Sequence, residues 1–134
     1  MLPPERSPRM LAIMPSVAVV DDDLDACETL VRIFEDHGYS AYGVANGEAA
    51  LRLLGGVKCD LLVTDFQMPG MDGEDLVRAV RAALPAASRM PVIILSGRDR
   101  DAWSDTNVIF VGKPPDINSL MSLADKLVER APSR

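Results

Sequence analysis

Four short apolar runs recur along the chain, and polar residues follow each of them. Continuous apolar runs of this length are typical of strands that are buried on both faces of a sheet. The runs cover residues 16–20, 61–64, 91–95 and 108–111, and the polar residues after them are Asp21-Asp22-Asp23, Asp65, Ser96-Gly97 and Gly112-Lys113. A further stretch, residues 39–44, alternates more weakly and predicts an edge strand.

Between these strands, apolar residues recur at intervals of three and four, which is typical of helices with one buried face. The intervals predict helices over residues 24–37, 48–54 and 72–84, and a last helix after Asp116. The predicted inward faces are Leu24, Cys27, Leu30, Val31 and Phe34 in the first helix and Ile117, Leu120, Met121, Ala124 and Val128 in the last.

The residues at the ends of these helices support the same boundaries. Asp23 and Asp116 are good N-caps because their carboxylates can accept hydrogen bonds from the first free N–H groups. Gly38 and the pair Gly55-Gly56 are predicted to end the first two helices. His37, the only histidine, lies near a helix C-terminus and is expected to be a capping or surface residue.

Strands that alternate with helices imply right-handed crossovers and a parallel sheet covered on both faces. In such sheets ligands bind at the carboxyl ends of the strands. We therefore expect the polar residues after the strands to meet at one rim: Asp21, Asp22, Asp65, Ser96 and Lys113.

Composition narrows the class of protein. The 134 residues are enough for one domain, and the net charge of −6 argues against a nucleic-acid surface. No apolar run reaches the roughly 18 residues that a membrane span requires. Cys27 and Cys59 are too few for a disulfide framework, so we expect reduced thiols in a cytoplasmic protein.

The sequence predicts one domain over residues 16–130. We expect a flexible leader over residues 1–15 before it and a short tail over residues 131–134 after it.

The acidic residues at the rim carry the candidate chemistry. Adjacent ionised carboxylates repel each other unless a cation or a pKa shift relieves the repulsion. Mg²⁺ prefers a few carboxylate oxygens together with water and phosphate, so Asp21, Asp22 and Asp65 predict a magnesium site. The alternative for residues 21–23 is a solvated turn and helix cap. Asp65 is the candidate nucleophile, since a carboxylate can accept a phosphoryl group as an acyl phosphate.

The motifs VVDDD, VTDFQMPGMDG, ILSG and KP, in this order, resemble the receiver domain of bacterial two-component response regulators, the CheY-like family. The resemblance covers about residues 16–128. It implies a flavodoxin-like, doubly wound sheet of five parallel strands in the order 2-1-3-4-5. It also implies that the phosphoryl donor is a phosphohistidine on a sensor histidine kinase or a histidine phosphotransfer protein.

The same resemblance assigns roles to single residues. The main-chain carbonyl of Gln67 would be a further metal ligand, and a cis Lys113-Pro114 bond would aim the lysine at a phosphoryl oxygen. Ser96 would be the hydroxyl that responds to phosphorylation. Phe110 occupies the position of a switching aromatic, although simple core packing is an equal alternative. Gly70 and Gly73 are expected to let the loop after Asp65 turn closely.

The segment between Ser96 and Lys113 departs from the family because it is shorter than usual. Residues 98–107 show no apolar face, which predicts a shortened or irregular fourth helix there. Trp103 is expected either to anchor a partner or to cover the sheet in place of that helix. Arg98 and Arg100 are expected to be surface residues or to meet a partner.

Three functions are compatible with these residues. The first is a stand-alone receiver that acts through a downstream protein target, as a monomer or a homodimer, and has no enzymatic turnover beyond slow self-dephosphorylation. The second is a degenerate receiver that binds partners without phosphorylation. The third is a phosphatase of the haloacid-dehalogenase type, but Leu24-Asp25 does not continue the signature that Asp21 and Asp23 imitate.

Overall fold

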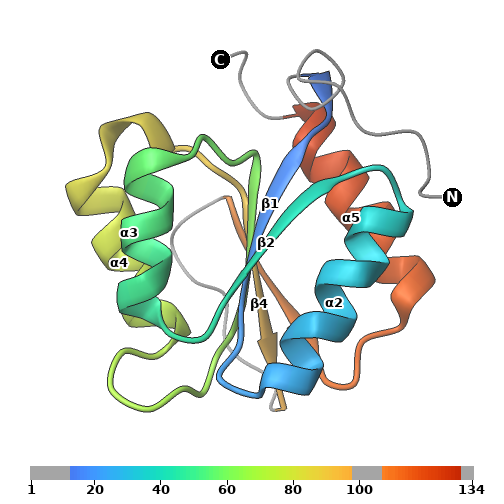
Figure 1. Cartoon of the computed structure of the whole chain (residues 1–134), viewed down its shortest axis with the longest axis horizontal. Coiled ribbons are helices and arrows are strands. Elements are labelled where there is room, and N and C mark those ends of the chain that lie inside the picture. Colours follow the sequence, from blue (N-terminus) through green and yellow to red (C-terminus); the bar gives the residue numbers. More distant parts are fainter. Residues whose placement is uncertain (1–12, 98–106, 131–134) are drawn as a thin grey trace, which may run out of the picture.

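The computed structural model describes residues 13–97 and 107–130, which form three layers (Figure 1). The sheet has five parallel strands. Figure 1 shows it nearly edge-on, with α3 and α4 on one face and α2 and α5 on the other. The elements are β1 (Ser16–Val20), α2 (Leu24–Asp36), β2 (Ser40–Val44), α3 (Gly47–Gly56), β3 (Leu61–Asp65), α4 (Gly73–Ala83), the 3₁₀ turn η1 (Pro85–Ala87), β4 (Val92–Ser96), β5 (Val108–Gly112) and α5 (Ile117–Arg130).

The strand order is β2-β1-β3-β4-β5, which confirms the flavodoxin-like winding predicted from the sequence. All four strand pairs are parallel. The central strands β3 and β4 are buried along their whole length, as their continuous apolar runs predicted. The edge strand β2 is half-buried and has the weaker pattern that an edge position allows.

Alternate residues of each strand feed two separate cores. Leu62 of β3 faces α3 and α4 together with Ile94 of β4, whereas Leu61 and Val63 face α2 and α5. Complete burial of such a side chain stabilises the fold by about 1.5–3 kcal/mol. Because both faces of the sheet are covered in this way, only the strand ends are left to carry polar chemistry.

The strand register brings the carboxyl ends together. Thr64 pairs with Val20 of β1, so Asp65 and Asp21 leave adjacent strands at the same level. Ser96 of β4 pairs with Gly112 of β5, one residue before Lys113. The rim that the sequence predicted is therefore present, at the lower end of the sheet in Figure 1.

Two predicted N-caps are confirmed by hydrogen bonds. Asp23 accepts from the N–H groups of Asp25 and Ala26 at 3.0 and 3.2 Å, which starts α2. Asp116 accepts from Ser119 N–H at 2.9 Å at the start of α5. At the other end of α2, His37 Nδ1 lies 2.8 Å from the carbonyl oxygen of Ile33.

Two expectations about the helices are wrong. Leu24 was assigned to the buried face of the first helix, but its side chain is 69% exposed. It is the first residue of α2 and lies at the rim, where no strand remains for it to cover. Gly55 and Gly56 do not stop α3 but form its last turn, because the chain stays helical until Val57 donates to the carbonyl of Leu53 at 2.8 Å.

Both cysteines are buried and free, in agreement with the prediction of reduced thiols. Burial raises the pKa of the Cys59 thiol to about 11. None of the helices within residues 13–97 and 107–130 has the length and apolar character needed to cross a membrane. The shortened helix predicted over residues 98–107, together with Arg98, Arg100 and Trp103, lies almost entirely outside the described residues, as does most of the predicted leader.

Candidate functional site

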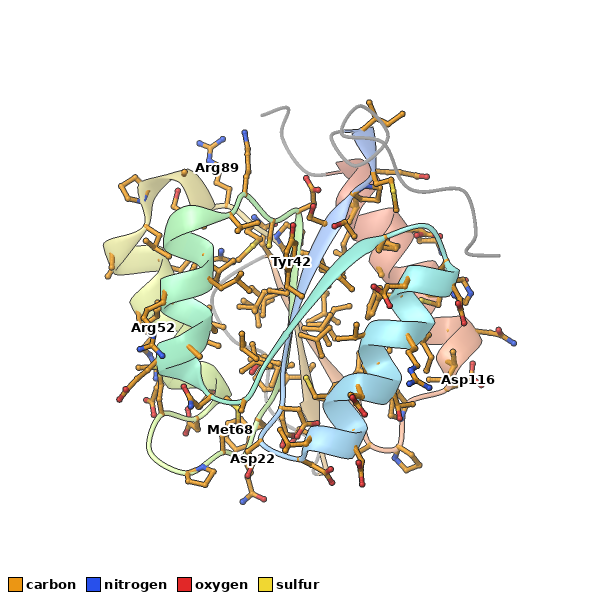
Figure 2. All side chains as sticks on the ribbon, viewed as in Figure 1. Asp22, Tyr42, Arg52, Met68, Arg89 and Asp116 are labelled. Atoms are coloured by element: carbon orange, nitrogen blue, oxygen red, sulfur yellow. The ribbon has the colours of Figure 1, made fainter. Side chains whose placement is uncertain are left out.

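Three carboxylates meet at the carboxyl end of the sheet. Asp21 follows β1, Asp22 comes next, and Asp65 is the last residue of β3; one oxygen from each lies within 4.8 Å of the others. Asp21 and Asp65 are buried, whereas Asp22 is exposed and is labelled at the lower rim in Figure 2. The cluster is therefore closed on the protein side and open to solvent through Asp22.

Asp21 is held from two directions. Its N–H donates to the carbonyl of Val44 at 3.1 Å, and its Oδ1 accepts from the N–H of Asp23 at 2.9 Å. Burial raises the pKa of the Asp21 carboxyl, and the negative charge of Asp65 raises it further; the Asp23 hydrogen bond and the Lys113 charge oppose this shift. Such a group favours a nearby cation, which would relieve the cost of keeping its charge buried.

Lys113 forms an ion pair with Asp65 through its Nζ and the Oδ1 of the carboxylate. The lysine side chain is 38% exposed and the aspartate side chain 9%, so the ammonium reaches the buried carboxylate from the solvent side. The lysine backbone is fixed as well, because Lys113 N–H donates to the carbonyl of Ser96 at 2.9 Å. The Lys113-Pro114 peptide bond is cis, as the resemblance implied.

The loop after Asp65 turns back tightly onto the strand. Gly73 N–H donates to the carbonyl of Phe66 at 2.8 Å, and a Cβ on Gly73 would lie 2.7 Å from the carbonyl oxygen of Asp65. Gly70 has a φ of +78°, a conformation that glycine adopts without penalty. Both glycines therefore do what the sequence predicted. Gln67 lies within this loop, two residues after Asp65, with its side chain exposed.

Ser96 and Phe110 lie on one face of neighbouring strands. In the register of β4 and β5, Ile94 pairs with Phe110 and Ser96 pairs with Gly112, which places Phe110 one pleat behind Ser96. Ser96 is buried, and Phe110 is half-buried against the core formed with α3 and α4. The structure thus places the two proposed switch residues as diagonal neighbours.

Comparison with known proteins assigns this arrangement to a family. The family model described as "Response regulator receiver domain" matches residues 17–124. The chain belongs to the response regulator receiver family. Receivers are the signalling modules of two-component systems.

Curated relatives of this receiver are longer proteins. The transcriptional regulatory protein AfsQ1 of Streptomyces coelicolor is 34% identical over 89 residues, which are 66% of this chain and 37% of that protein. The transcriptional regulatory protein GlrR of Escherichia coli is 33% identical over 118 residues, 84% of this chain and 26% of that protein. The receiver thus spans only about a quarter to over a third of these relatives.

Solved structures agree with the family and the fold. A response regulator receiver protein from Pseudomonas putida has a TM-score of 0.76 at 33% identity, covering 84% of this chain and 97% of that one. The receiver domain of the Francisella response regulator 1452 has a TM-score of 0.74 at 29% identity, covering 87% and 98%. Vibrio cholerae CheY4 supports the fold alone, with a TM-score of 0.79 at 23% identity and coverage of 85% and 98%.

The acidic cluster fits the Mg²⁺ ion that receivers typically bind. Its three carboxylates supply hard oxygen ligands within reach of one another, and the exposed side at Asp22 leaves room for water and phosphate oxygens. The structure brings together the acidic residues and Lys113 as predicted from the sequence. The role of each residue stays a proposal.

One support of this receiver site was not recognised from sequence. The sequence pattern assigns no role to Asn46, which lies between the predicted edge strand and the predicted second helix. In the structure Asn46 caps α3 by accepting from Ala49 N–H at 2.8 Å, and the nearby carbonyl of Val44 holds Asp21. Asn is a common N-cap, which was a usable signal, whereas a main-chain carbonyl leaves none in the sequence.

Proposed function

We propose that this receiver accepts a phosphoryl group on Asp65 from the phosphohistidine of a sensor histidine kinase or a histidine phosphotransfer protein, in a Mg²⁺-dependent reaction. One observation carries the proposal: the buried carboxylate of Asp65 belongs to the acidic cluster and also pairs with the ammonium of Lys113. Phosphoryl transfer depends mainly on such positioning and charge neutralisation.

In the proposed reaction an oxygen of Asp65 forms a bond to phosphorus while the phosphorus–nitrogen bond of the donor breaks. The electron pair of that bond stays on the imidazole nitrogen, which takes a proton from solvent. Mg²⁺ held by Asp21, Asp22, Asp65 and the Gln67 carbonyl would neutralise charge on the phosphoryl oxygens. Lys113 already pairs with Asp65 and would shift its ammonium to a phosphoryl oxygen of the product.

Ser96 and Phe110 are the proposed switch. Phosphorylated Asp65 offers new acceptor oxygens at the rim, and the Ser96 hydroxyl can donate to one of them. The movement would draw the β4 end inward, and Phe110, which lies one pleat behind on the same face, would fill the space that is vacated. A signal made at Asp65 would in this way reach the face of β4 and β5 that carries both residues.

We further propose that this receiver acts in the cytoplasm through phosphorylation-controlled contact with another protein, with one domain over residues 16–130. The net charge of −6 favours a protein partner over DNA. Slow loss of its own phosphate would be its only chemical turnover. The stand-alone organisation and the homodimer stay predictions from sequence.

The function is tested by intact mass spectrometry after incubation with acetyl phosphate. We expect one phosphate adduct that depends on Mg²⁺ and is absent from Asp65→Ala. An adduct of full yield on Asp65→Ala would show that the nucleophile is another residue. If neither acetyl phosphate nor a panel of phosphorylated histidine kinases labels the protein, the degenerate receiver becomes the better explanation.

The phosphatase alternative makes a different prediction. A haloacid-dehalogenase-type enzyme would release phosphate with rapid turnover, whereas a receiver holds its acyl phosphate and loses it slowly. Phosphate release measured alongside the adduct separates the two. The strand order and the match over residues 17–124 favour the receiver.

A further inference from the structure

Residues 44–47 span the end of β2 and the start of α3, and we call them the β2–α3 connection. The connection contacts two segments of the acidic site: the one that carries Asp21 and the loop after Asp65. At its start the carbonyl of Val44 accepts the N–H of Asp21 at 3.1 Å. At its end Gly47 faces Met71, which belongs to the loop after Asp65. No side chain of this connection belongs to the acidic cluster. Its contacts can therefore affect the site only through the positions of the two segments that carry the proposed metal ligands.

A Cβ on Gly47 would fit only if Met71 moved. A Cβ on Gly47 would lie 2.6 Å from Sδ, 3.0 Å from Cγ and 3.2 Å from Cβ of Met71. Sδ and Cγ could move away by bond rotation, but the Cβ of Met71 moves only with its backbone. Among the described glycines only Gly38 and Gly70 have a positive φ, so Gly47 is needed for space and not for its backbone conformation.

Met71 lies at a point of the loop where little freedom remains. Gly70 before it makes the left-handed turn, and Asp72 after it caps α4 in a reciprocal pair of hydrogen bonds with Asp75, at 2.8 and 3.1 Å. Because the capping box holds the C-terminal side of Met71, a displacement of Met71 would be taken up by the loop on its N-terminal side, which contains Gln67. Both segments lie at the lower end of the molecule in Figure 1, below α3.

We propose that Gly47 and Met71 are positioning residues that set the distance between Asp21 and the Gln67 loop, and thereby the affinity for Mg²⁺. The inference rests on the function proposed above, because it concerns the same metal site. The β2–α3 connection acts as a spacer: its Val44 end holds the Asp21 segment, and its Gly47 end holds the loop through the Met71 side chain.

The test is a Mg²⁺ titration followed by backbone amide chemical shifts, with the free energy of unfolding measured in urea in parallel. Gly47→Ala should weaken Mg²⁺ binding about tenfold, the lower end of the losses found when residues that support metal ligands are changed. Gly55→Ala is the matched control, because it makes the same change in the same helix at a position with nothing within 4 Å of the new Cβ. It should bind Mg²⁺ as the wild type does.

A second pair of variants separates positioning from general damage. Met71→Ala removes the contact from the other side and should also weaken Mg²⁺ binding. In the double variant Gly47→Ala/Met71→Ala the new methyl group no longer meets Sδ and Cγ, so part of the lost affinity should return. Additive losses in the double variant would show that the two residues act independently, which would refute the spacer contact.

The outcomes distinguish this inference from the function on which it rests. If the wild type shows no saturable Mg²⁺ response, the metal site and this inference both fall. If the wild type binds Mg²⁺ and both Gly47→Ala and Met71→Ala bind it equally well, the metal site stands and the spacer role is refuted. Should Gly47→Ala fail to fold, Met71→Ala alone decides between the two.

Discussion

Asp65 and Lys113 form an ion pair at the carboxyl end of the sheet. A single buried carboxylate beside Asp21 would suffer repulsion without relief. The positive charge of Lys113 relieves part of this repulsion, and a bound cation would relieve more of it. The negative charges of Asp21 and Asp65 are therefore balanced only when both Lys113 and a cation are present.

Lys113→Ala tests whether the lysine is needed for the conformational response and not for phosphorylation itself. The variant should still form the phosphate adduct, because Asp65 and the acidic cluster stay intact. It should lose the charge-assisted contact to the phosphoryl oxygen, which is worth about 1.5–3 kcal/mol. The measurement is amide hydrogen exchange of β4 and β5 in the presence and absence of acetyl phosphate.

The expected result is a smaller gain in protection than in the wild type. Equal protection in Lys113→Ala and wild type would show that the conformational response does not pass through the lysine. Lys126→Ala, on α5 and exposed, serves as the control for loss of one positive charge elsewhere.

At the scale of elements, replacing a glycine by alanine should change the free energy of unfolding in opposite directions in α3 and α4. Gly55 is exposed and a Cβ there meets nothing within 4 Å, so Gly55→Ala should raise the free energy of unfolding by about 0.5–1 kcal/mol. Gly73 packs on the backbone of Asp65, where a Cβ would lie 2.7 Å from the carbonyl oxygen. Gly73→Ala should lower the free energy of unfolding by about 1–3 kcal/mol.

Urea unfolding of both variants checks this pair of expectations. The backbone atoms of Asp65 cannot rotate away as a side chain could, which is why the sign should reverse between the two helices. A neutral result for Gly73→Ala would show that the start of α4 can shift away from β3 without cost.

The cap of α5 should make part of the stability depend on pH. Hydrogen bonds from Ser119, first from its side chain and then from its N–H, lower the pKa of Asp116. A carboxyl whose folded pKa is lowered stabilises the fold above its ordinary pKa, and this contribution is lost as the pH falls through the lowered value. Asp116→Asn keeps an acceptor at every pH.

Urea unfolding from roughly pH 7 to pH 3, across the ordinary aspartate pKa, measures this dependence. Asp116→Ala should be less stable than the wild type at neutral pH, and the difference should shrink on acidification. Asp116→Asn should lose less stability than the wild type over the same range. Parallel curves for all three proteins would contradict the capping role.

For the whole molecule, the sequence was sufficient to predict the strand order of the sheet and to bring most of the candidate site residues to one rim. Asp21 and Asp65 could be placed together because each ends an apolar run, and parallel strands bring such ends to one rim. Leu24 was misplaced because helical periodicity does not show where the sheet stops. The contact of Gly47 with Met71 could not be foreseen, since it depends on how closely two distant loops approach.

Mg²⁺ should stabilise the folded chain as a whole. A ligand that binds only the folded state raises the free energy of unfolding by about 2.7 kcal/mol when it is present at one hundred times its Kd. Urea unfolding with and without Mg²⁺ measures this gain. Asp22→Asn, at an exposed position of the acidic cluster, should show a smaller gain. An equal gain in the variant would place the ion elsewhere.

The most direct test of the central claim is to locate the phosphate. Borohydride reduces an aspartyl phosphate to homoserine, so peptide mass spectrometry after labelling and reduction shows which carboxylate carried the group. We expect homoserine at position 65, only in samples labelled with Mg²⁺ present. Homoserine at position 21 or 22, or a phosphate that survives reduction, would contradict Asp65 as the phosphoacceptor.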